Sequence, residues 1–186
     1  MPLDVVCLDI PDVKIIRPQK FGDHRGFFME TYNRKAYALA GITDDLVQDN
    51  HSLSAQIGTV RGLHFQSPPF AQGKLVRVVQ GRILDIAVDL RKSSPSFGKW
   101  VSAEISADEA NQIWIPAGFA HGFCTLEAHT QVIYKVSAYY TPQHDLGLLW
   151  NDPDLGIDWP IAADQATLSQ KDRDLPRLRD MPSPFA

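Results

Sequence analysis

Short runs of β-branched and aromatic residues recur along residues 47–150, and clusters of Gly, Pro, Asn and Ser separate them. Runs of this length, with turn residues at regular spacing, are typical of antiparallel sandwiches and barrels. Within 83–90, apolar side chains alternate with a second set that includes Asp85 and Asp89, which is the two-residue period of a half-buried strand. The pattern predicts an all-β fold built mainly from hairpins.

The expected strands are 27–32, 47–52, 60–65, 75–79, 83–90, 100–105, 112–115, 122–127 and 131–139. The aromatic side chains of the first of these strands are expected to serve packing. One short helix is predicted over 34–39, because Asn33 can cap its N-terminus and Gly41 can end it. A second helical segment is expected at 163–168.

The composition indicates a single domain over residues 1–186, since 44% of the residues are hydrophobic and can form a sizeable core. Residues 151–186 are rich in Pro and Asp, and we expect them to wrap the barrel as a C-terminal tail. The net charge of −4 argues against nucleic-acid and anionic-membrane partners. Two widely separated cysteines, and the lack of a long apolar run, predict a cytoplasmic protein without a disulfide framework or membrane span.

Two segments, 61–66 and 116–121, each place a histidine beside glycine at the edge of a predicted strand. A cupin metal site commonly needs two histidines two residues apart, a carboxylate shortly after them and a later histidine. Gln66 stands where the second histidine would be, and no glutamate follows it within the next predicted strand. Only His64 and His121 fit, so we predict that the site holds no metal.

The alternative is acid–base chemistry with His64 as the general base, because a neutral imidazole suits this role near neutral pH. Alternation within 131–139 places Tyr134 on an apolar face that points inward. Lys74 shares its face with apolar residues of 75–79, so it either serves the site or extends into water at the rim of the barrel. The side chains available for anionic groups are Arg25, Arg61 and Lys171.

Strict alternation sends Arg61 and His64 to opposite faces of their strand. Both can reach one pocket only if the strand bulges near Gly62 or if the pocket lies at the end of the strand. The sequence leaves these two arrangements open.

Collinear motifs extend over nearly the whole chain, from about residue 13 to about residue 178. They are 21–28 (FGDHRGFF), 48–52 (QDNHS), 60–64 (VRGLH), 73–76 (GKLV), 116–123 (PAGFAHGF), 134–135 (YK), 150–153 (WNDP) and 169–172 (SQKD). With these motifs the chain closely resembles the dTDP-4-dehydrorhamnose 3,5-epimerase family of cupin-like sugar-nucleotide epimerases. The resemblance implies a cupin-type antiparallel β-barrel, or jelly roll, with a few short helices.

The resemblance also implies an isomerase of dTDP-rhamnose biosynthesis. Such an enzyme inverts C3 and C5 of dTDP-4-dehydro-6-deoxy-D-glucose through an enolate, giving dTDP-4-dehydro-L-rhamnose without a cofactor. His64 would be the base, Asp172 would orient it, Lys74 would stabilise the enolate oxygen and Tyr134 would return the proton from the other side.

The positions that match substrate contacts of the family are Arg25, Glu30, Gln48, Asn50, Arg61, His121, Asp145 and Lys171. Asp145 stands where members usually carry a glutamate. The family further implies a homodimer in which the neighbouring subunit supplies part of each site. The alternatives are a C3-only epimerase, a ketoisomerase of another dTDP-deoxysugar pathway, and a non-catalytic cupin that binds nucleotide sugars.

Overall fold

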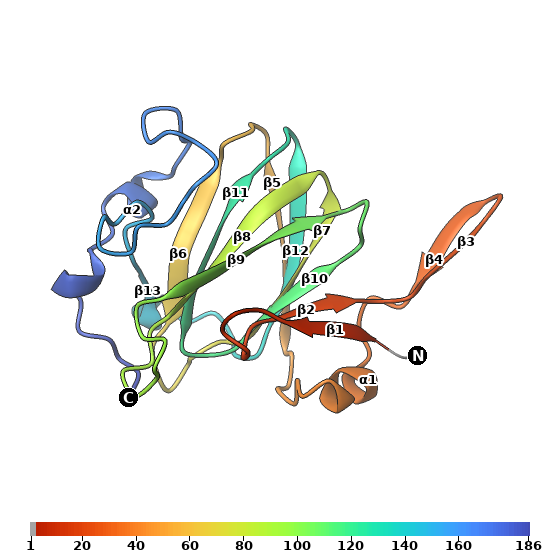
Figure 1. The fold of residues 1–186 in the computed structure, drawn as a ribbon, viewed down its shortest axis with the longest axis horizontal. Helices are drawn as coiled ribbons and strands as arrows, with labels where there is room; N and C mark the ends of the chain where they lie inside the picture. Colours follow the sequence, from red (N-terminus) through yellow and green to blue (C-terminus); the bar gives the residue numbers. More distant parts are fainter. Residues whose placement is uncertain (1–2) are drawn as a thin grey trace.

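The computed structural model describes residues 3–186 as two antiparallel sheets stacked face to face, which is the expected all-β jelly roll (Figure 1). The strands are β1 (Asp4–Cys7), β2 (Lys14–Arg17), β3 (Lys20–Asp23), β4 (Gly26–Met29), β5 (Gln48–Ser54), β6 (Val60–Gln66), β7 (Lys74–Gln80), β8 (Arg82–Asp89), β9 (Trp100–Ser106), β10 (Gln112–Ile115), β11 (Phe119–Thr125), β12 (Thr130–Val136) and β13 (Asp145–Gly147). The helices are α1 (Arg34–Leu39), α2 (Gln170–Arg173) and the 3-10 turns η1 (Pro142–His144) and η2 (Leu178–Asp180). Within residues 3–186, no helix has the length and apolar character needed to cross a membrane.

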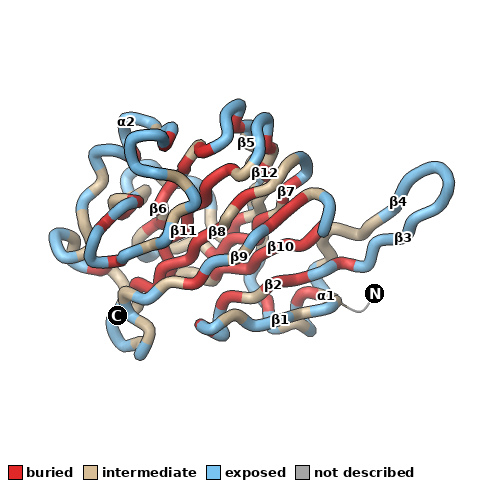
Figure 2. Tube along the Cα trace, turned by 45° about the horizontal axis from the view of Figure 1, so that its top comes forward, coloured by how far each residue is buried: buried red, intermediate tan, exposed pale blue. Residues whose placement is uncertain are grey.

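The first sheet has the strand order β1-β2-β10-β7-β12-β5, and the second has the order β13-β6-β11-β8-β9. Side chains from both inner faces interdigitate in the main core, and the most deeply buried include Val76, Ile83, Ile113 and Val132. Figure 2 shows buried positions concentrated along the central strands. The two sheets therefore provide two facing walls for any cavity between them.

Strand β8 is buried on both faces, so the prediction of a half-buried strand is wrong. Ile83 and Ala87 face the core between the sheets. Ile86 and Val88 face outward and pack beneath the C-terminal segment, where they share a cluster with Leu155. The outer face of the second sheet is thus covered by residues more than sixty positions further along the chain.

The predicted helix at 34–39 is confirmed as α1, and the Asn33 side chain accepts hydrogen bonds from the first turn. The second predicted helix, at 163–168, is wrong. Thr167 instead forms a parallel bridge with Thr59, and its N–H donates to the Gly58 carbonyl at 3.0 Å. Backbone groups of this segment are therefore used in sheet-like pairing, and the helix α2 begins only after it.

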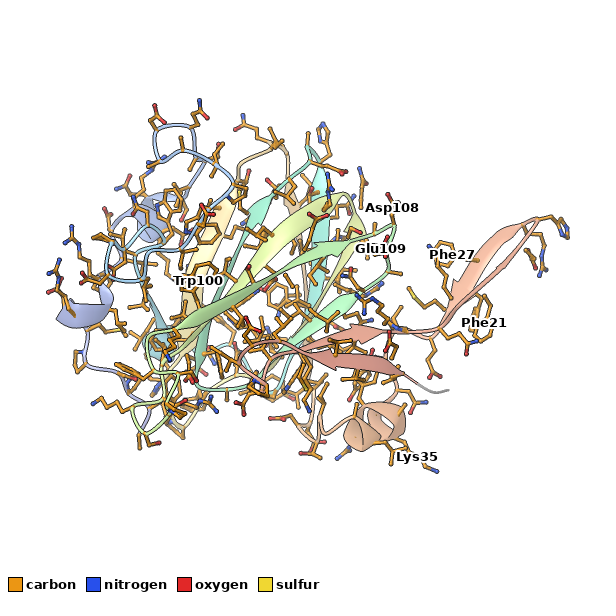
Figure 3. All side chains as sticks on the ribbon, in the orientation of Figure 1. Phe21, Phe27, Lys35, Trp100, Asp108 and Glu109 are labelled. Atoms are coloured by element: carbon orange, nitrogen blue, oxygen red, sulfur yellow. The ribbon has the colours of Figure 1, made fainter. Side chains whose placement is uncertain are left out.

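Strands β3 and β4 form a two-stranded arm that projects from the barrel (Figure 1). The aromatic side chains of this segment were expected to serve packing, but within the single chain Phe27 and Phe28 do not enter the core and are 61% and 69% exposed. Phe21 on the neighbouring strand is 43% exposed. Figure 3 shows Phe21 and Phe27 on this arm, away from the core.

Candidate active site

A cavity of about 290 Å³ lies between the two sheets. Its lining residues are Ser52, Arg61, His64, Lys74, His121, Phe123, Tyr134, Ser169, Lys171 and Asp172. A second cavity of about 220 Å³ shares His64, Lys74, Tyr134 and Lys171 with the first. Gln48, Asn50 and Asp145 line this second cavity. All the predicted catalytic residues and most of the predicted substrate contacts therefore meet in one place.

A bulge in β6 brings Arg61 and His64 to the same cavity. His64 is opposite His121 on β11, whereas Arg61 is opposite Phe123, so β6 contains one more residue than β11 over this stretch. Gly62 at the bulge has a φ of 121°, and a Cβ atom there would lie 2.5 Å from the Gly122 Cα. Of the two arrangements that the sequence left open, the structure has the bulge.

His64 is hydrogen-bonded to Asp172 through its Nε2, with 2.6 Å between Nε2 and Oδ1. Asp172 lies on the short helix α2, where the Ser169 hydroxyl caps its backbone N–H. Burial alone would raise the pKa of Asp172, but the hydrogen bond and charge of His64 outweigh burial and lower it. The carboxylate thus stays ionised and fixes the imidazole with Nδ1 as its remaining nitrogen.

Lys74 opens β7 inside the barrel and is only 8% exposed, so its placement at a solvated rim is wrong. Its ammonium donates to the backbone carbonyl of His64 at 3.1 Å. Burial lowers the pKa of Lys74 to about 8, and the carboxylates of Asp145 and Asp85 oppose this shift. A buried ammonium with few partners can stabilise negative charge on a bound ligand.

Tyr134 on β12 points inward, as predicted, and packs against the main core. Burial raises the pKa of its phenol, while the charge of Arg61 acts in the opposite direction. The hydroxyl is therefore protonated at neutral pH and can donate a proton. Since β12 and β6 belong to different sheets, Tyr134 and His64 face the cavity from opposite walls.

His121 is paired with a residue that the sequence analysis did not select. Its Nε2 lies 2.9 Å from Oδ2 of Asp85 on β8. Asp85 is fully buried, and its other oxygen, Oδ1, has no hydrogen-bond partner among residues 3–186. An aspartate among Ile83 and Ala87, on the inner face of a core strand, is the signal that would have found it.

Polar contacts join the segments that border the second cavity, here called its mouth: the loops 67–73 and 137–141, the strand β13 and the helix α2. Asp145 accepts from Lys171 at 2.5 Å and from the Tyr140 hydroxyl at 3.0 Å. The buried Gln66 amide donates to the Phe70 and Tyr139 carbonyls, at 2.7 and 3.1 Å, and accepts from the Thr141 N–H at 2.7 Å. The position where a cupin metal site would have a histidine therefore serves to tie the mouth loops together.

Arg25 and Glu30 do not reach this cavity within the single chain. Arg25 lies at the tip of the β3–β4 arm, where it pairs with Asp23 at 2.5 Å and is largely exposed. Glu30 follows the arm and accepts from Asn33. Neither residue therefore contributes to this cavity from its own chain.

No group of three or more His, Cys, Asp or Glu side chains could hold a metal ion in the part of the chain that the structure describes. His64 and His121 instead each bond to a carboxylate of their own. The donor set is that of two His–Asp pairs, which supports proton transfer and hydrogen bonding.

Comparisons with known proteins identify the family. The family model for dTDP-4-dehydrorhamnose 3,5-epimerase matches residues 7–180. The dTDP-4-dehydrorhamnose 3,5-epimerase of Sinorhizobium fredii is 56% identical over 178 residues, which cover 96% of this chain and 91% of the relative. The Bacillus anthracis enzyme, with TDP and PPi bound, superimposes with a TM-score of 0.92 at 52% identity, covering 95% of this chain and 99% of that one.

A second solved structure is the Legionella pneumophila 3,5-epimerase in complex with dTDP-4-keto-L-rhamnose. Its TM-score is 0.91 at 46% identity, covering 95% of this chain and 93% of that one. The matches run through both sheets, the arm and the C-terminal segment. This chain belongs to the dTDP-4-dehydrorhamnose 3,5-epimerase family of isomerases.

Proposed function

We propose that this protein converts dTDP-4-dehydro-6-deoxy-D-glucose into dTDP-4-dehydro-L-rhamnose by proton transfer at C3 and C5, with His64 as the base. The observation that carries the proposal is the His64–Asp172 pair at 2.6 Å, which shares one cavity with Lys74 and Tyr134. The Legionella relative holds dTDP-4-keto-L-rhamnose, and the Bacillus relative holds TDP. These ligands support a dTDP-sugar as the substrate of this chain.

The C4 ketone of such a sugar acidifies the protons on C3 and C5. His64 takes one of them on Nδ1, because Asp172 holds Nε2. The electron pair moves onto the C4 oxygen as an enolate, and the Lys74 ammonium stabilises this charge. Tyr134 then donates its phenolic proton to the same carbon from the opposite wall, which inverts the centre. Exchange with solvent restores both groups.

Two cations that line the first cavity fit the diphosphate. Arg61 and Lys171 border the cavity, and a guanidinium is suited to forked contacts with phosphate oxygens. Asn50 and Gln48 line the adjoining cavity and offer neutral amide groups to the sugar or the base. His121 also lines the cavity and contacts a sugar hydroxyl.

The protein acts as a homodimer in which the arm of each subunit packs on the other. The support is the exposure of Phe21, Phe27 and Phe28 on a projecting hairpin, since monomers rarely expose such a cluster. In this arrangement Arg25 reaches the cavity of the neighbouring subunit. The whole chain forms one domain, and residues 151–186 are the tail that wraps it. We place the enzyme in the cytoplasm.

Mixing two inactive variants tests the shared site. Arg25→Ala and His64→Ala should each be inactive alone. A heterodimer of the two has one site with both wild-type residues if Arg25 acts on the neighbouring subunit, so mixing after partial unfolding should restore activity. If Arg25 acts within its own subunit, the mixture stays inactive.

Incubation with dTDP-4-dehydro-6-deoxy-D-glucose in D₂O tests the reaction itself. The proposal predicts deuterium at both C3 and C5 of the product, measured by proton NMR and mass spectrometry. Exchange at C3 alone would assign the protein to the single-centre epimerases. Tight binding of dTDP without exchange at either carbon would make it a binding module.

A further inference from the structure

Asp85 is the least accessible charged group near the cavity. Its side chain is fully buried on β8, one oxygen is bonded to His121 at 2.9 Å, and the other has no partner among the described residues. An incompletely paired carboxylate in a core is strongly disfavoured relative to one in water. Packing alone does not account for it, because its neighbours on the inner face of β8, Ile83 and Ala87, are apolar.

We propose that Asp85 is a positioning residue for the epimerisation, acting through His121 and Lys74. This inference rests on the proposed function of the cavity. Asp85 fixes the His121 ring so that one defined nitrogen meets the sugar, and its negative charge keeps Lys74 in the ammonium form that stabilises the enolate.

The sheet geometry supports the role of Asp85 in fixing the His121 ring. His121 on β11 is directly opposite His64 on β6, so the two rings lie side by side on one wall. Each ring is held at Nε2 by a carboxylate from another element, Asp172 of α2 for His64 and Asp85 of β8 for His121. With Nε2–H donated to Asp85, His121 presents a bare Nδ1 that accepts a hydrogen bond from a sugar hydroxyl.

The charges around the cavity support the role of Asp85 in keeping Lys74 in the ammonium form. The titratable and charged groups that line the two cavities beside Lys74 are Arg61 and His64 on β6, His121 on β11, Tyr134 on β12, Tyr140 in the loop after β12, Asp145 on β13, and Lys171 and Asp172 on α2. Burial raises the pKa of Asp85, and His121 and Lys74 act against it. Conversely, Asp145 and Asp85 raise the pKa of Lys74 against its burial. Removing the charge of Asp85 therefore lowers the pKa of Lys74 further.

The test compares Asp85→Asn with the wild type and with Asp89→Asn. The amide introduced by Asp85→Asn keeps the shape and an acceptor oxygen but loses the charge. Asp89 is a matched control, because it is a fully buried carboxylate on the same strand that bonds to Arg91 and lines neither cavity. For each protein, kcat and KM are measured across pH 6–9, with dTDP binding and a thermal melt alongside.

We expect Asp85→Asn to bind dTDP within about twofold of the wild type. Its kcat should fall by about 10- to 100-fold, which is the loss typical when a residue that hydrogen-bonds a metal-ligating histidine is mutated. The alkaline limb of its kcat profile should move to lower pH, whereas Asp89→Asn should keep the wild-type limb. An unchanged kcat and limb in Asp85→Asn would overturn the proposal. So would an equal displacement of the limb in Asp89→Asn.

A second measurement uses the wild-type protein, so it does not depend on how a variant folds. In ¹⁵N-histidine spectra, assigned with His121→Gln, His121 should be the Nε2–H tautomer. An Nδ1–H tautomer would contradict the role of Asp85. If the wild type itself exchanges no deuterium into the sugar, the proposed function fails; if it does and Asp85→Asn behaves as wild type, only this inference fails.

Discussion

His64 and Tyr134 lie on opposite walls of the same cavity, His64 on β6 of one sheet and Tyr134 on β12 of the other. Inversion at carbon needs a base on one face and an acid on the other. A jelly roll provides this arrangement because its two sheets face each other across a space about 10 Å thick. The proposed chemistry therefore follows from the fold.

The His64–Asp172 pair should be required for exchange. His64→Ala should abolish deuterium incorporation, and Asp172→Asn should lower kcat by about 10²-fold or more, because the amide no longer fixes the productive tautomer. Asp174→Asn is the control next to the same short helix, since the Asp174 side chain is exposed and accepts from the Gln170 amide. An Asp172→Asn enzyme with the kcat of the control would refute the orienting role.

Activity should fall as pH rises through about 8, the value to which burial lowers the pKa of Lys74. Below this pH the ammonium stabilises the enolate, and above it the neutral amine does not. A profile of kcat against pH measures this alkaline limb, the fall in kcat above about pH 8. Lys74→Met should lose on the order of 10²-fold or more in kcat and should lack the limb; a limb that persists in this variant would assign it to another group.

Gly62→Ala should destabilise the protein by about 1–3 kcal/mol, because the residue needs a φ of 121° and the new Cβ would lie 2.5 Å from the Gly122 Cα. Denaturant unfolding measures the loss. Gly156→Ala is the control, since Gly156 also has a positive φ but has open space around its Cβ position. Equal losses in the two variants would show that close approach at the bulge contributes nothing.

Gln66→Met should raise KM more than it lowers kcat. The substitution removes the amide that joins the Phe70, Tyr139 and Thr141 backbones and so loosens the mouth loops, while His64 and Asp172 remain in place. The unpaired backbone groups should also cost about 1–3 kcal/mol in unfolding free energy. Gln143→Met, at an exposed position of the same mouth, should change neither quantity.

Features that depend on local sequence were predictable. Strands such as β10 follow from short runs of β-branched and aromatic residues, and the helix α1 follows from its Asn33 cap. Both are properties of neighbouring residues. The inward orientation of Tyr134 follows from the two-residue period of its strand.

Features that depend on contacts between residues far apart in sequence could not be predicted. Both faces of β8 are buried because the segment after residue 150 covers the outer one. The bulge at Gly62 became definite only through its pairing with β11. The pairing of Asp85 with His121 could not be predicted, because the two residues are 36 positions apart in sequence. Arg25 lies on an arm that leaves the barrel, so one chain cannot complete its predicted contact.

Tyr134→Phe tests the central claim most directly. If His64 removes the proton and Tyr134 returns one from the opposite wall, the variant should still exchange the acidic protons with D₂O through His64. It should form product with inverted centres at least ~10²-fold more slowly, within the range for loss of a general acid. Proton NMR of the recovered sugar nucleotide separates the two outcomes. Inversion by Tyr134→Phe at the wild-type rate would contradict the account.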